Sequence, residues 1–220
     1  VSLAVEEGEI VAFVGPSGCG KTTLLSMAGC LLTPTSGRVS ILGEDVGAMK
    51  QAQRAAFRLR HIGFVFQAYH LLAALNVRQN VEIALNLAGM AGSAAFERAE
   101  ELLALFELDH RARSAPGTLS GGEQQRLAIA RPLANRPDII LADEPTASLD
   151  SRAGHRVMEL LRAAVEAGHA RSMVVVTHDT RILGLAHRVL PMEDGQLAPG
   201  ARPAQENRDA CENGAPAPGQ

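Results

Sequence analysis

Short apolar stretches alternate with longer helical patterns along most of this chain. Ile10–Val14 is a continuous apolar run of the kind that forms a buried strand, and residues 23–32 after it favour a helix. Similar strand patterns recur at 38–42, 62–66, 138–142, 172–176 and 188–192. Strands that alternate with helices predict an α/β fold with a largely parallel sheet covered on both faces.

Three parts of the chain depart from this alternation. Residues 1–5 alternate like a strand from the first position, which indicates that the natural chain begins earlier. Residues 76–117 carry two amphipathic helical patterns and form a block too long for an ordinary loop. From residue 198 the chain is rich in Pro, Gly, Ala and polar residues. We therefore predict a core at 1–75 and 118–197, a helical subdomain at 76–117 and a disordered tail at 198–220.

The turn between the first strand and the first helix fits the phosphate-binding pattern G-x-x-x-x-G-K-[ST]. Glycines let its backbone bend so that N–H groups converge on phosphate oxygens, and the helix start adds a positive dipole end. Lys21 can reach the β- and γ-phosphates, and the Thr22 hydroxyl can bind Mg²⁺. The predicted nucleotide-binding residues here are Gly15, Pro16, Ser17, Gly18, Cys19, Gly20, Lys21, Thr22 and Thr23. A strand–helix turn that binds nothing is the weaker alternative, because strand, loop and helix all agree with the motif.

A pair of acids follows a second apolar strand. Asp143 and Glu144 stand after residues 139–142, at the strand end where ligands bind in open α/β sheets. Asp143 can accept a hydrogen bond from a Mg²⁺-bound water, and Glu144 can orient or deprotonate the attacking water. The alternative is a plain acidic turn. With the phosphate loop present, the pair favours Mg²⁺-dependent hydrolysis of a nucleoside triphosphate.

The composition of the chain limits the kinds of molecule that it is expected to bind. The 220 residues suit one α/β domain with a small subdomain, and no apolar run approaches the ~20 residues of a membrane-spanning helix. The net charge is −3, aromatic residues make up 3% and tryptophan is absent, so we expect no nucleic-acid partner. Cys19, Cys30 and Cys211 show no metal-ligand spacing.

A second helix start also has the features of a phosphate site. In the run LSGGEQQR, Ser120 is a good N-cap, and Gly121 and Gly122 expose backbone N–H groups. One chain with one complete loop and a second such helix start favours a second site that serves the nucleotide of another copy. Ser120 and Glu123 could equally form a plain capping box, and the residues alone leave the two interpretations about even.

Together these motifs resemble the ATP-binding subunit of an ABC transporter, over residues 1–197. LSGGEQQR is similar to the family signature. The resemblance implies that Gln67 reaches the Mg²⁺ and senses the membrane partner, that 148–150 form the loop crossing the dimer interface, and that His178 contacts the γ-phosphate. The implied catalytic residues are Glu144, His178 and Gln67, and the implied metal ligands are Thr22, Gln67 and Asp143.

The resemblance also implies an architecture and partners. The expected fold is that of a P-loop NTPase with a largely parallel core sheet, an antiparallel β edge and an inserted helical subdomain. Two copies would sandwich two ATP molecules on an integral membrane permease, at the cytoplasmic face of the inner membrane. Segments such as 62–67 and 177–183 are similar to the lipoprotein-release, macrolide-export and heterocyst-glycolipid-export branch. That branch often adds a periplasmic adaptor and an outer-membrane channel. The alternatives are a cell-division relative that signals to cell-wall enzymes and a soluble, non-transport ABC ATPase.

Two further features carry expectations. Pro132 stands where the family usually has alanine, inside the helix after the signature, and it predicts a kink or an early helix end. Residues 68–80 offer apolar side chains, Leu72 among them, and follow Gln67 directly. We expect this segment to dock the membrane subunit; packing against the helical subdomain is the alternative.

Overall fold

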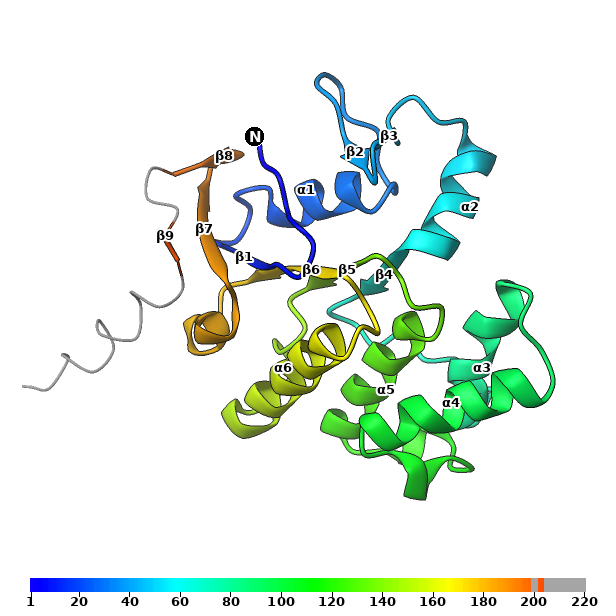
Figure 1. Ribbon diagram of the computed structural model, residues 1–220. Helices are drawn as coiled ribbons and strands as arrows, with labels where there is room; N and C mark the ends of the chain where they lie inside the picture. The colour runs from blue at the N-terminus through cyan, green and yellow to red at the C-terminus, as the bar shows by residue number, and fades with distance from the viewer. Residues whose placement is uncertain (199–201, 204–220) are drawn as a thin grey trace, which may run out of the picture.

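The computed structural model describes residues 1–198 and 202–203, and a sheet with helices on both faces forms its centre (Figure 1). The strand order is β4-β5-β6-β1-β7-β8, with β9 paired to β7. The strands are β1 (Ile10–Val14), β4 (Ile62–Val65), β5 (Ile139–Asp143), β6 (Ser172–Thr177), β7 (Arg188–Glu193), β8 (Gln196–Leu197) and β9 (Arg202–Pro203). Pairs among β4, β5, β6, β1 and β7 are parallel, whereas β8 and β9 run antiparallel to β7. The predicted α/β fold with a largely parallel sheet is confirmed.

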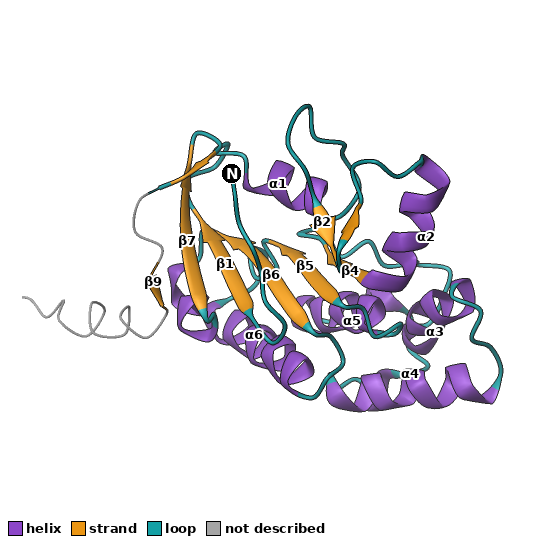
Figure 2. Ribbon diagram, turned by 45° about the horizontal axis from the view of Figure 1, so that its top comes forward, coloured by secondary structure: helices purple, strands orange, loops and turns teal. Residues whose placement is uncertain are grey.

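Alternation along the strands divides the core into two layers. In β1, Ile10 and Ala12 face one apolar cluster, and Val11 and Phe13 face the other. Helix α1 (Lys21–Ala28) packs on the side of Val11 and Phe13, against β5 and β6. Helices α5 (Gly121–Leu133) and α6 (Ser151–Glu166) cover the opposite face, as Figure 2 shows. The loops that begin α1 and α5 therefore belong to elements on opposite faces of the sheet.

The helical block after β4 packs mainly on α5. It contains α3 (Val77–Leu87), α4 (Ser93–Leu105) and the 3₁₀ turns η1 (Asp109–Arg111) and η2 (Pro116–Thr118). Val77, Val81 and Leu85 form a buried stripe at helical spacing, and α3 contacts α4 and α5. This is the packing that a helical subdomain needs, and its boundaries at 76 and 117 stay a prediction.

The antiparallel edge predicted for the fold is present, but one expected strand is absent. Strands β2 (Ser40–Ile41) and β3 (Glu44–Asp45) pair antiparallel with each other, beside α2 (Gln51–His61). The predicted strand at residues 1–5 is wrong, because no other segment of the described chain pairs with it. An alternating pattern becomes a strand only where a neighbouring strand accepts its hydrogen bonds.

Two helix ends show what glycine and proline do locally. Helix α1 ends at Ala28 and not at 32, because Gly29 caps it and Cys30 adopts a left-handed φ of 57°. Helix α5 ends at Leu133, one residue beyond Pro132, which agrees with the early end predicted there. Gly63 of β4 makes room for this proline, since a Cβ at Gly63 would lie 3.3 Å from the Pro132 Cβ.

The C-terminal part of the described chain contains a short 3₁₀ helix and strand β9. Residues 180–185 form the 3₁₀ helix η3 (Thr180–Leu185). The prediction of a disordered tail at 198–220 falls mostly on residues 199–201 and 204–220, which lie outside the described residues. Strand β9, at 202–203, belongs to the same tail and is described. In the described part of the chain, no helix combines the length and the apolar character that crossing a membrane requires.

Candidate active site

Of the nine residues predicted to bind the nucleotide, Gly15 to Gly20 form the loop between the end of β1 and the start of α1, and Lys21, Thr22 and Thr23 form the first turn of α1. Gly18 and Gly20 adopt left-handed φ values of 83° and 98°, a conformation that glycine reaches without strain. A Cβ at Gly15 would lie 2.1 Å from the Met192 carbonyl oxygen, so the close approach of β7 also requires glycine there. The sequence pattern therefore matches the backbone demands of the loop.

The Lys21 side chain folds across this loop. Its ammonium donates hydrogen bonds to the carbonyl oxygens of Gly15 and Pro16, both at 2.8 Å, and lies 3.6 Å from the Cys19 sulfur. Lys21 is 6% exposed, which is unusual for lysine. A buried ammonium whose partners are two carbonyl oxygens and a thiol carries no paired anion, so it offers a strong position for phosphate oxygens.

Thr22 and Asp143 meet at the edge of the sheet. The Thr22 hydroxyl donates to Asp143 Oδ1 at 3.1 Å, although the two residues are far apart in sequence. Burial raises the pKa of Asp143 above its ordinary value and the neighbouring Glu144 adds to this, while the Thr22 hydrogen bond and Lys21 oppose it. A bound cation would favour the ionised form of Asp143. The Thr22 hydroxyl and the Asp143 carboxylate supply oxygen ligands, which Mg²⁺ prefers.

Gln67 is the one predicted metal ligand that does not join this pair. It follows β4, which is the neighbour of β5, so it lies at the same edge of the sheet as Asp143. Its side chain is exposed. Among the described residues, no hydrogen bond links it to Thr22 or Asp143.

Glu144 and His178 form the second pair at this edge. His178 Nδ1 lies 2.9 Å from the Glu144 carboxylate, and the backbone N–H of His178 donates to Glu144 Oε2 at 3.4 Å. Parallel pairing of β5 with β6 sets Asp143 opposite Val176, which brings the residues after both strands together. Glu144 has a positive φ of 49°, uncommon outside glycine, and its N–H is bound by the Val176 carbonyl at 2.9 Å. The arrangement holds a carboxylate beside an imidazole.

The start of α5 forms a capping box. The Ser120 hydroxyl and N–H both donate to Glu123 Oε2 at 2.8 Å, and the Glu123 N–H donates back to Ser120 Oγ at 3.3 Å. Arg111 of η1 donates to Glu123 Oε1 at 3.0 Å. Hydrogen bonds from the Ser120 backbone, from its hydroxyl and from Arg111 lower the pKa of Glu123 to about 2 against the opposing effect of burial.

The capping box leaves room for a second role. The first N–H groups of a helix have no partner within the helix, and Gly121 and Gly122 place no side chain over them. Between this helix start and the phosphate loop, the described residues provide no hydrogen bond or ion pair. The structure therefore gathers Lys21, Thr22, Asp143, Glu144 and His178 at one edge and places Ser120 elsewhere.

Asn80 is a residue whose importance the sequence analysis missed. It is fully buried on α3, where its Oδ1 accepts from the Leu72 N–H at 2.8 Å. Its Nδ2 donates to the carbonyl oxygens of Leu72 and Leu75, both at 3.1 Å, and of Asn76 at 3.0 Å. A polar residue inside the apolar stripe of a helix is the signal that could have revealed it.

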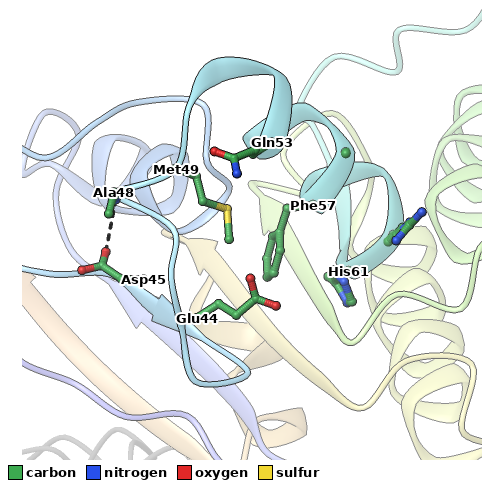
Figure 3. A pocket seen from close by; sticks show the side chains of 9 residues that line it. Glu44, Asp45, Ala48, Met49, Gln53, Phe57 and His61 are labelled. Carbon is green, nitrogen blue, oxygen red and sulfur yellow. Dashed lines mark hydrogen bonds between the residues drawn. The ribbon is translucent and has the colours of Figure 1, made fainter.

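A pocket of about 550 Å³ lies away from all of these groups, between β2–β3 and α2 (Figure 3). Its lining includes Glu44, Asp45, Met49, Gln53, Phe57 and His61. None of the predicted site residues contributes to it. The candidate site is therefore defined by converging polar groups at the sheet edge and not by this hollow.

Comparison with known proteins identifies the class. Residues 1–147 match the family described as ABC transporter, and the chain belongs to this family. Among solved structures, it is similar to the dimeric bacterial ABC transporter cassette MJ0796, with 40% identity, a TM-score of 0.83 and coverage of 92% of this chain and 88% of that chain. A post-hydrolysis dimer of MJ0796 bound to ADP and Pi matches with a TM-score of 0.82. The P-loop NTPase fold and the ATPase class are thus confirmed.

The curated relatives narrow the branch. The macrolide export ATP-binding/permease protein MacB of Photorhabdus laumondii is 45% identical over 197 residues, 90% of this chain and 30% of that protein. MacB of Chromobacterium violaceum is 44% identical over 221 residues, 98% of this chain and 34% of that protein. The chain therefore spans about a third of the length of these relatives. Similarity to the macrolide-export branch, as the sequence motifs indicated, is confirmed.

Proposed function

We propose that this chain is the ATP-hydrolysing motor of a bacterial export or lipid-extraction system, acting as a nucleotide-sandwich dimer on a membrane permease. The observation that carries the proposal is the separation of two half-sites. The sheet edge holds Lys21 with the Thr22–Asp143 and Glu144–His178 pairs, whereas Ser120 stands at a helix start on another element. The dimeric cassettes among the structural relatives support it.

The phosphate loop would bind the nucleotide. Oxygens of the β- and γ-phosphates would replace the carbonyl oxygens of Gly15 and Pro16 as partners of the Lys21 ammonium. Thr22 and Asp143 would hold Mg²⁺, with Gln67 as the third protein ligand. The bound ion neutralises charge that develops on the phosphate oxygens.

Glu144 would act on the attacking water. Its carboxylate orients the water and accepts its proton as the oxygen attacks the γ-phosphorus, the bond to ADP breaks and phosphate leaves. His178 holds this carboxylate at 2.9 Å, so the base is fixed in direction before the nucleotide arrives. The exposed imidazole is free to turn toward the γ-phosphate.

The second half-site would come from the other copy. Ser120, Gly121 and Gly122 of one protein would donate to the γ-phosphate held by the loop of its partner. The Ser120 hydroxyl must then turn from Glu123 toward the phosphate. Closure of the two copies would thus couple ATP binding to movement.

The permease would receive that movement at residues 68–80. Leu72 is 44% exposed there, whereas Leu71 packs on the main core. The MacB relatives carry the words ATP-binding/permease in their name, which supports a permease as the membrane component. A place at the cytoplasmic face of the inner membrane is part of the same proposal. A periplasmic adaptor and an outer-membrane channel belong to the same proposal.

The Glu144→Gln variant tests the proposal. The amide keeps the shape of the side chain but is a poor base, so closure should occur and hydrolysis should stop. Sedimentation of the variant is expected to show a monomer alone and a dimer with ATP. A variant that binds ATP yet stays monomeric would overturn the sandwich.

A further inference from the structure

The segment that follows Gln67, residues 68–72, lies against both ends of α5. The Arg131 guanidinium, near the end of α5, donates to the carbonyl oxygens of His70 at 2.6 Å and Tyr69 at 3.4 Å. The Tyr69 hydroxyl lies 3.4 Å from the position that a Cβ would take on Gly121, the first residue of the helix. This segment therefore spans the helix that carries Ser120.

The same hydroxyl forms a hydrogen bond with another element. It is 3.0 Å from the Ser148 hydroxyl, and either oxygen can be the donor. Ser148 belongs to the turn between the acids that end β5 and the start of α6, where Asp150 caps the helix by accepting from the Ala153 N–H at 2.9 Å. One phenol oxygen thus lies between the start of α5 and the turn that follows Glu144.

The other end of the segment is fixed as well. Asn80 binds both the N–H and the carbonyl of Leu72, and it is fully buried. Arg131 and Asn80 together hold the backbone on either side of Leu71. A segment anchored at both ends transmits a displacement to its contacts more than a loop with free ends does.

We propose that the Tyr69 hydroxyl is a positioning group, which sets the spacing between the start of α5 and the turn containing Ser148. Both elements would face a second copy of the chain, so the inference rests on the sandwich dimer of the proposed function. Tyrosine suits this role because its rigid ring holds the hydroxyl far from the backbone at little cost in conformational entropy. Phenylalanine would keep the ring and lose the bridge.

A double-mutant cycle in the Glu144→Gln background tests the bridge. Tyr69→Phe and Ser148→Ala are each expected to weaken the ATP-dependent dimer roughly two- to tenfold, the range that one net hydrogen bond spans. The combined variant should be no weaker than the weaker of the two, because both changes remove the same contact. The affinity of the monomer for ATP should not change, since neither residue lies in the phosphate loop.

Thr118→Val is the matched control. Its hydroxyl lies close to the signature but donates only to the Ala115 carbonyl, at 2.8 Å, so the dimer should keep its affinity. Full dimer affinity in Tyr69→Phe, additive losses in the double variant, or an equal loss in Thr118→Val would each overturn the bridge. The parent variant Glu144→Gln distinguishes the two failures. If it stays monomeric with ATP, the proposed function is overturned and the bridge with it. If it dimerises and Tyr69→Phe has no effect, the bridge alone is overturned.

Discussion

The two regions of this chain that are predicted to bind phosphate differ in the chemistry that surrounds them. At the phosphate loop, the ends of β1, β5 and β6 bring together an ammonium, a hydroxyl–carboxylate pair and a carboxylate–imidazole pair. At the start of α5, Ser120 bonds to Glu123, Arg111 donates to the same carboxylate, and the Tyr69 hydroxyl lies near Gly121. The first region has a buried ammonium, two carboxylates and an imidazole, while the second has helix N–H groups and a hydroxyl beside one carboxylate that Arg111 pairs with.

Under the proposed function, this difference is the reason that one copy of the chain would be incomplete. In that proposal, the start of α5 would contact a phosphate but carries no group placed to activate water, so it would act only beside the phosphate loop and Glu144 of another copy. Glu123 is an anion at neutral pH, because its pKa is about 2, and Arg111 offsets that charge where a phosphate would approach. The two regions predict opposite effects for substitutions.

Ser120→Arg should have the largest effect, on hydrolysis. The long cation blocks the approach of the second copy and removes a donor to the transition state, so the ATPase rate should fall at least about 100-fold. ATP affinity of the monomer should stay the same, because the loop lies on another element. The variant also loses its N-cap, worth ~1 kcal/mol, and a melting curve must show that it folds.

Ser93→Arg provides the control for that experiment. It places the same side chain at the exposed start of α4, and normal hydrolysis is expected. If Ser120→Arg hydrolyses ATP at the normal rate, the start of α5 is only a capped helix and the comparison between the two regions fails.

Lys21→Ala tests the other region. Loss of a buried, charge-assisted donor should weaken ATP binding by more than tenfold, and no neighbouring cation can replace it. Titration of a fluorescent ATP analogue measures this. Lys50→Ala, at the exposed start of α2, should leave the affinity unchanged. Equal affinity in Lys21→Ala would show that the nucleotide binds elsewhere.

Features that depend on neighbours in sequence could be predicted. The phosphate loop is set by its own glycines, and the capping box joins Ser120 to a residue three positions later. The strands at Ile10–Val14 and Ile139–Asp143 follow from their apolar runs. In each case the physical cause lies within a few residues.

Features that depend on which distant segment packs beside a given residue could not be predicted from the local sequence. The bridge between Tyr69 and Ser148 joins residues 79 apart, and the pair Thr22–Asp143 joins residues 121 apart. Residues 1–5 alternate as a strand should, yet no neighbouring strand pairs with them in the described chain. The resemblance implied that Thr22 and Asp143 serve the same metal ion, but the direct hydrogen bond between them follows from the order of the strands in the sheet.

Glu123→Gln tests how much the capping box at the start of α5 stabilises the fold. The folded pKa lies below the ordinary value, so the carboxylate stabilises the fold above about pH 4.5 and loses this effect as the pH falls toward 2. At pH 7 the variant should be less stable by about 1–2 kcal/mol, and the difference should shrink between pH 5 and pH 3. Urea unfolding at several pH values measures it. Glu97→Gln, on the exposed face of α4, should show no such trend, and a flat difference in Glu123→Gln would contradict the cap.

Pro132→Ala should have the smallest effect, and it separates the two ends of α5. Proline lacks the N–H that would bind the carbonyl four residues earlier, at a cost of ~3 kcal/mol in a helix interior. Here it stands one residue before the end of the helix, and its ring restricts the unfolded chain by ~0.4–1 kcal/mol, so a net gain of about 1 kcal/mol is expected. Hydrolysis should not change, since Ser120 lies at the other end. A loss of stability would show that ring packing beside Gly63 outweighs the recovered hydrogen bond.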